Sequence, residues 1–215
     1  MIYETDYYIL EYSNEDFEYI EELKSYIDLN ILDIIEFFNL ENFKDKINIK
    51  LFGDLEDFRN VINKLTNMEV PEWLCGFSFS KGDKEYIYTL SLDNYKKTLS
   101  HENDELVDLK KLIMHEIVHA CNRKYSGNYN VPLWLKEGLA LYLAKQDKYI
   151  NKDLNANCYQ LMNDVVSYHN YLIVINYALN KYGKEYILGL LNDRKKAEDE
   201  TFKLYEEIKC LNERK

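Results

Sequence analysis

The stretch MHEIVHA, residues 114–120, holds two of the chain's four histidines, four positions apart, with a glutamate directly after the first. On a helix, side chains at positions i and i+4 lie one above the other, so both imidazoles can reach a single cation. The residue after the first histidine is rotated by about 100°, where its carboxylate can reach a water on the cation without binding the cation itself. His115, Glu116 and His119 therefore predict two metal ligands and a general base.

The residues around this motif predict a helix over 104–122 with two different sides. At about 100° per residue, His115 and His119 lie beside Asp108 and Leu112, away from the main apolar stripe. That stripe consists of Leu106, Leu109, Ile113, Ile117 and Ala120. The position of the histidines favours a metal site over the alternative, in which both are buried, hydrogen-bonded core histidines.

A catalytic zinc site needs three protein ligands and one open position, so a third ligand is expected later in the chain. The segment WLKEGLALYLA, residues 134–144, supplies Glu137 on an apolar helix face. Burial of an unpaired carboxylate costs several kcal/mol, which predicts a cation as its partner. The alternative is a partly exposed Glu137, or one paired with a lysine. Gly138 weakens this helix unless another backbone approaches it closely.

The rest of the sequence predicts an α+β fold, with a small mixed or antiparallel sheet near the N-terminus and a mostly helical C-terminal half. Period-two patterns predict strands at 7–12 and 47–52 and a hairpin at 76–92. Helical spacing predicts helices at 15–40, 54–67 with Asp54 as N-cap, 104–122, 133–146, 157–182, 184–192 and 195–213. Gly183 is expected to stop a helix in the left-handed αL conformation. The last helix should pack inward through Phe202, Leu204, Tyr205 and Ile208.

Composition and charge exclude several classes of protein. A net charge of −11 disfavours nucleic acid and anionic membranes as partners. The four cysteines are far apart, which indicates thiols rather than a disulfide framework. The first residues lack the pattern of a signal peptide, and no run of about 18 apolar residues occurs. We therefore expect a cytoplasmic protein.

HEIVH followed by PLWLKEGLALYL resembles the gluzincin metallopeptidases, in particular the short peptidase domains of the peptidase MA-like group. That group combines a helix bearing HE-x-x-H with a later proline, tryptophan and E-G-x-A. The likeness extends more weakly to PEWLCGFSFSKGDKEYIYTLSL upstream and to SYHNYLIVINYALNKYGKEYILGLL downstream. It covers about residues 46–192 and implies a zincin-like peptidase domain over 46–215. Residues 1–45 would be an N-terminal extension of one strand and one helix, joined with it in one compact unit.

The resemblance implies a zinc-dependent peptidase in which His115, His119 and Glu137 bind Zn²⁺ and Glu116 is the general base. It also points to Tyr168, with His169 as a competitor, as the donor to the oxyanion. A packing or surface role for Tyr168 is equally compatible with the sequence. The strand at 85–92 would be the sheet edge that binds an extended peptide, or simply a half-buried hairpin strand.

Two departures from the family pattern bear on the substrate. Leu141 stands where thermolysin-like enzymes have the aspartate of E-x-x-x-D, and no G-x-M-E-N motif is present to hold a free N-terminus. An endopeptidase acting on a peptide or protein is therefore expected rather than an aminopeptidase. The competing hypotheses are a catalytically inert zincin-fold binding module and an acidic helical interaction protein without a metal.

Overall fold

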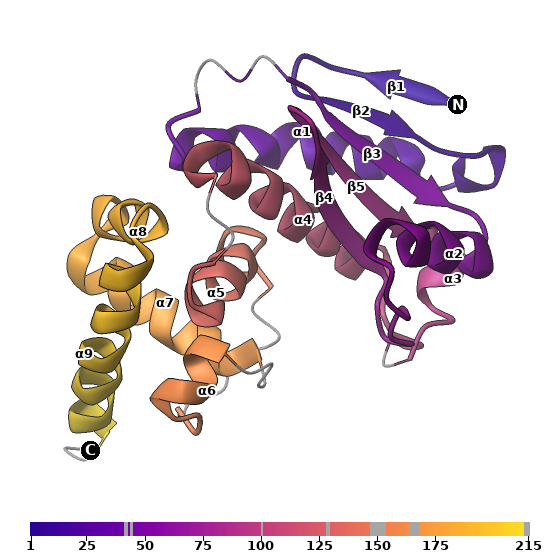
Figure 1. Ribbon diagram of the computed structural model, residues 1–215. Coiled ribbons are helices and arrows are strands. Elements are labelled where there is room, and N and C mark those ends of the chain that lie inside the picture. The colour runs from indigo at the N-terminus through magenta and orange to yellow at the C-terminus, as the bar shows by residue number, and fades with distance from the viewer. Residues whose placement is uncertain are drawn as a thin grey trace. The chain divides into compact units, whose positions relative to one another are not determined.

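Figure 1 shows the chain as a computed structural model that describes residues 1–40, 43, 45–99, 101–127, 130–146, 154–163 and 168–212. The chain divides into two compact units, Met1–Ala120 and Cys121–Lys215. The described strands all belong to the first unit, and the described part of the second unit is helical. The expected α+β fold, with its sheet near the N-terminus and a mostly helical C-terminal half, is confirmed.

The described strands of the first unit form one five-stranded mixed sheet in the order β1-β2-β3-β5-β4. The three central strands are parallel to one another, and the two outer strands are antiparallel to their neighbours. The bounds are β1 Ile2–Glu4, β2 Tyr8–Glu11, β3 Ile47–Phe52, β4 Gly76–Lys81 and β5 Lys84–Leu90. All but β1 were predicted; β1 has only three residues, too few for a period-two pattern to be recognised.

Register and burial explain why the central strands stay together. Leu10 pairs with Ile49, and Ile49 pairs with Ile87, so three aliphatic side chains form one row across β2, β3 and β5. All three are at most 1% exposed. Each such side chain stabilises the fold by roughly 1.5–3 kcal/mol through removal from water. A slip of one residue would turn the whole row to the other face, so this burial fixes the register.

The predicted hairpin is confirmed, but the predicted sheet edge is wrong. Strands β4 and β5 pair across a two-residue turn in which Gly82 has a φ of +61°, a conformation that glycine adopts at no steric cost. Strand β5 pairs with β4 on one side and with β3 on the other, so the segment 85–92 has no free edge. Strand β4 forms the edge instead.

The helices of the first unit cover the sheet and carry the histidine motif. Their bounds are the 3-10 helix η1 Asn14–Asp16, α1 Ile20–Phe37, α2 Leu55–Thr66, α3 Leu92–Tyr95 and α4 Leu106–Ser126, whose last turns continue into the second unit. Asp54 caps α2 as predicted, because its side chain accepts a hydrogen bond of 2.8 Å from the backbone N–H of Asp57. Helices α1 and α4 are joined by an ion pair between Glu22 and Lys110.

The first 45 residues take part in the same sheet through β1 and β2. Strand β2 pairs in parallel with β3, from Tyr8 opposite Ile47 onward. Two ion pairs of 2.6 Å reinforce this join, one between Lys46 and Glu4 and one between Lys50 and Glu11. Helix α1 contributes a row of buried residues at helical spacing, namely Ile20, Leu23, Ile27, Ile31 and Ile34.

The described part of the second unit consists of helices packed around Trp134. Their bounds are α5 Leu133–Leu143, α6 Cys158–Asn163, α7 Tyr168–Tyr182, α8 Lys184–Leu191 and α9 Arg194–Asn212. The indole N–H of Trp134 donates a hydrogen bond of 2.8 Å to Oγ1 of Thr201, and both residues are fully buried. Within the helix predicted over 157–182, residues 164–167 lie outside the described residues, as do residues 128–129 and 213.

Two expectations for the second unit are corrected. Gly183 separates α7 from α8 with φ +80° and ψ 178°, so its ψ is extended and differs from that of an αL residue. Phe202 is 53% exposed, whereas Leu204 and Ile208 are buried as predicted and Tyr205 is half-buried. Thr201, the residue before Phe202, is buried instead. Its Oγ1 accepts a hydrogen bond from the buried indole of Trp134.

None of the helices among the described residues combines the length and the apolar character needed to cross a membrane.

Candidate metal centre

Helix α4 places the two histidines of the motif with their rings adjacent. The Nε2 atoms of His115 and His119 lie 3.0 Å apart, and the ring planes are nearly perpendicular, at 85°. Each residue is 7% exposed, whereas Leu109, Ile113 and Ile117 on the apolar stripe are fully buried. The predicted stripe is thus confirmed except at Leu106, which is half-buried. The two imidazoles have their Nε2 atoms adjacent.

Burial of the histidine pair alone does not separate a metal site from a pair of core histidines. Two neutral imidazoles can form one hydrogen bond when one of the two Nε2 atoms carries a proton. The same two nitrogens can instead both direct lone pairs at a cation. A third ligand therefore decides between the two interpretations.

Glu137 is the third residue, and α5 carries it one turn after the helix begins. Pro132 precedes the first helical residue with φ −51°, a value compatible with the start of a helix. The side chain of Glu137 is 16% exposed, and its Oε1 lies 3.3 Å from Nζ of Lys136. Partial exposure and a lysine partner, both foreseen as alternatives, are therefore present. Both side chains of this pair are half-buried.

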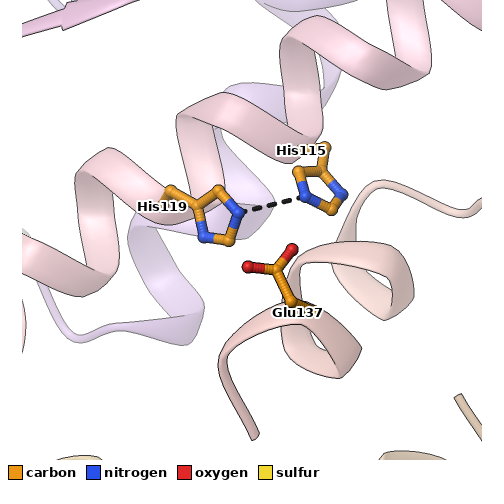
Figure 2. Close-up of side chains that lie close together, drawn as sticks. All are labelled: His115, His119 and Glu137. Atoms are coloured by element: carbon orange, nitrogen blue, oxygen red, sulfur yellow. Dashed lines mark hydrogen bonds between the residues drawn. The ribbon is translucent and has the colours of Figure 1, made fainter. Parts of the chain in front are cut away.

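Figure 2 shows the carboxylate of Glu137 turned toward the two imidazole rings. One possible ligand atom from each of His115, His119 and Glu137 lies within 4.8 Å of the other two. Among the described residues, these three form the one group of at least three side chains that could hold a metal ion. The residues predicted as metal ligands are thus the ones that the structure groups together.

The donor set suits a divalent cation with affinity for nitrogen and oxygen. Two imidazoles and one carboxylate are the ligands of several catalytic zinc sites, with metal–ligand distances of about 2.0–2.2 Å. Two nitrogens on one tetrahedral zinc would be separated by about 3.3 Å, given those bond lengths. The observed 3.0 Å between the Nε2 atoms of His115 and His119 is close to that value. The chemistry of the donor set therefore fits such an ion, and His115, His119 and Glu137 would hold it.

Gly138, directly after the third ligand, allows α5 to approach α7 closely. A Cβ atom at this position would lie 2.8 Å from the backbone oxygen of Tyr171 and 3.3 Å from the Cβ of Ile175. A side chain there would force the two helices apart. The cost of a glycine inside the helix is therefore offset by helix packing, as the sequence suggested.

Glu116, the expected general base, lies beside the edge strand of the sheet. It is 7% exposed, and its Oε1 would be 3.3 Å from a Cβ atom placed on Gly76, the first residue of β4. Leu112, one turn earlier on α4, would lie 3.2 Å from the same Cβ. Gly76 was not recognised from the sequence, because nothing in a single glycine shows which helix its strand will meet.

Tyr168 and His169 open α7, as the position of a possible oxyanion donor would require. The ring of Tyr168 lies 6.1 Å from the ring of Tyr171, the residue whose backbone meets Gly138. Nε2 of His169 lies 3.3 Å from Oδ1 of Asn155 in an exposed contact. These contacts do not distinguish Tyr168 from His169 as the donor to an oxyanion.

Comparisons with known proteins return no match for this chain. No protein-family model matches it. No curated protein and no solved structure matches it either.

Proposed function

We propose that this chain is a zinc-dependent peptidase of the gluzincin type with a zincin-like fold. The observation that carries the proposal is the convergence of His115, His119 and Glu137, whose ligand atoms lie within 4.8 Å of one another. Glu116 adds a carboxylate that directly follows the first ligand in sequence. A site for binding alone has no need of such a base.

Each side chain of the site has its own role in the proposed hydrolysis. When bound, zinc supplies a Lewis acid that polarises a peptide carbonyl and makes water a better nucleophile. His115 and His119 offer neutral nitrogen ligands, and Glu137 offers one negative charge against the charge of the cation. Glu116 takes a proton from the attacking water and delivers it to the amine that leaves. Tyr168 would donate a hydrogen bond to the developing oxyanion.

Strand β4 is the proposed binding edge for an extended peptide. It is the outer strand of the sheet, so its outer edge is where another strand can pair with it. Its first residue, Gly76, lies beside the carboxylate of Glu116. A peptide added along β4 would therefore pass close to the general base. The absence of a motif for a free N-terminus favours an endopeptidase.

The proposal is tested by zinc analysis and by hydrolysis of an unfolded protein, with Glu116→Gln as the decisive variant. We expect about one zinc per chain in both the wild type and the variant, because glutamine removes the base without removing a ligand. Hydrolysis should fall by at least about a hundredfold, within the range typical of a lost general base. The matched control is Glu105→Gln, which changes an exposed glutamate just before α4 and should keep full activity.

Two outcomes would contradict this mechanism. Full activity in Glu116→Gln would remove the base from the mechanism. A wild-type chain that holds one zinc but cleaves no member of a broad peptide library would instead support the inert binding module.

A further inference from the structure

In the first unit, a thiol contacts an imidazole, and the same imidazole contacts a carboxylate. None of these three side chains is one of the proposed metal ligands. Sγ of Cys75, the residue before β4, lies 3.5 Å from Nε2 of His101. Nδ1 of His101 lies 2.7 Å from Oδ2 of Asp104. The latter two residues belong to the segment between α3 and α4. The order of the atoms is that of a nucleophile, a base and a residue that orients the base.

The carboxylate determines how the imidazole can act on the thiol. Because Asp104 accepts a hydrogen bond, the Nδ1 of His101 carries a proton and donates it to that bond. The Nε2 of the neutral ring is then the acceptor that faces Cys75. Transfer of the thiol proton to this nitrogen would give a thiolate, the form of cysteine that acts as a nucleophile.

Several contacts hold Asp104 and His101 in this orientation. The hydroxyl of Tyr95 donates a hydrogen bond of 2.6 Å to the same Oδ2 of Asp104. Burial, and then this hydrogen bond, raise the pKa of Tyr95, so the phenol keeps its proton and remains a donor. The Tyr95 ring lies 4.7 Å from the His101 ring, and the backbone N–H of Asp104 donates to the carbonyl of His101 at 3.0 Å.

We propose that Cys75, His101 and Asp104 form a reactive thiol site whose ligands are small peroxides. The thiol is 4% exposed, whereas the imidazole and carboxylate side chains are 18% and 15% exposed. A thiol with so little exposed surface favours small reagents. The site is independent of the metal and of any peptidase activity, although Gly76, the next residue, lies beside Glu116.

The oxidation balances with a peroxide as the only co-reactant. The thiolate sulfur of Cys75 attacks one peroxide oxygen, so an S–O bond forms as the O–O bond breaks. The departing oxygen takes the proton from Nε2 of the His101 imidazolium and leaves as water or an alcohol. Sulfur is oxidised by two electrons to a sulfenic acid, the peroxide is reduced by two, and the imidazole returns to its neutral form.

The other cysteines provide internal references in the same molecule. Cys210 is exposed on α9 and represents an accessible thiol. Burial raises the pKa of Cys158, which favours its unreactive thiol form. Asp104 and Asp108 are acidic groups near the proposed site, and both raise the pKa of Tyr95.

The test measures alkylation of the folded chain by iodoacetamide at pH 6, with mass spectrometry to assign the rate of each cysteine. At this pH an ordinary thiol is about 0.3% thiolate, so Cys75 should react at least about tenfold faster than Cys210. His101→Gln should slow Cys75 by at least about tenfold and leave Cys210 unchanged. His169→Gln, which changes another partly exposed histidine, is the matched control and should leave both rates unchanged.

A second measurement treats the chain with hydrogen peroxide and traps sulfenic acid with dimedone, which should label Cys75 first. If His101→Gln does not fold by circular dichroism, Asp104→Asn takes its place and should slow Cys75 at least about threefold. The proposal is overturned if Cys75 reacts no faster than Cys210 with both reagents, or if these variants leave its rate unchanged. Neither measurement depends on zinc or on peptide hydrolysis, so this result is separate from the test of the peptidase.

Discussion

At the level of single residues, the carboxylate of Glu137 lies close to two different kinds of partner. Its carboxylate is within 3.3 Å of the Lys136 ammonium, and it also faces the two imidazoles of the motif. The lysine side chain is 30% exposed, so water screens this ion pair. Two nitrogen ligands without a carboxylate would leave the cation short of one ligand and one negative charge. Glu137 is therefore more important for the proposed metal site than for the ion pair with Lys136.

Glu137→Gln should lower the affinity for zinc by at least about 100-fold, since loss of a partner outside the ligand set already costs about 10–100-fold. The amide keeps the shape of the side chain but supplies no charge. Glu105→Gln, which changes an exposed glutamate just before α4, is the matched control and should change the affinity by less than about threefold. Competition with a fluorescent zinc chelator measures both. Equal affinities for Glu137→Gln and the wild type would remove Glu137 from the ligand set.

At the level of elements, the packing of α5 on α7 depends on a glycine next to a functional residue. Gly138 allows the backbone of Tyr171 to pass at a distance that any Cβ atom would obstruct. From the sequence, Gly138 weakens this helix unless another backbone approaches it closely, and the sequence could not identify a helix that would do so. The contact matters for the site because Glu137 occupies the preceding position on the same helix.

Gly138→Ala should lower the free energy of unfolding by about 1–3 kcal/mol, because the new methyl group overpacks the contact with Tyr171. Gly189→Ala on α8 is the matched control, since its Cβ would meet only Nζ of Lys196, at 4.0 Å. That change should stabilise the chain by up to about 1 kcal/mol, as alanine favours the helix. Urea unfolding distinguishes the two. Equal stability of both variants would contradict the close approach of α5 and α7.

At the scale of the whole molecule, buried tyrosine phenols should make the free energy of unfolding fall at alkaline pH. Burial raises the pKa of Tyr8 and of Tyr95 above the ordinary 10.0, and hydrogen bonds to Asp28 and Asp104 act in the same direction. Both residues are at most 2% exposed. A raised pKa in the folded state means that the contribution to stability is complete below about pH 10, the unfolded value, and is lost as the pH rises above it.

Above about pH 10, each of these phenols should lower the free energy of unfolding by about 1.4 kcal/mol per pH unit, because only the unfolded chain releases the proton. Tyr8→Phe should reduce this slope by about the same amount, at some cost in stability at neutral pH through loss of the 2.8 Å bond to Asp28. Urea titrations at several pH values give the slopes. An unchanged slope in Tyr8→Phe would rule out its titration as a cause.

Local patterns were sufficient to predict most elements of this fold. The strand at 47–52, the cap at Asp54 and the hairpin around Gly82 depend on neighbours within a few residues, so the sequence specifies them directly. The edge of the sheet was misassigned because pairing partners lie far apart in the chain. Strand β5 pairs with β3 although more than thirty residues separate the paired positions in the chain, and no local pattern predicts that pairing.

The sequence by itself determined the identity of the candidate ligands and base, because the spacing of His115, Glu116 and His119 on a helix fixes which side chains share a face. It also indicated Glu137, since a carboxylate on an apolar face needs a partner. Only the tertiary structure decided that Gly76 lies beside the base, and that Cys75 faces His101. Both contacts join segments separated by more than twenty residues, and such contacts follow from the packing of strands and helices rather than from any local periodicity.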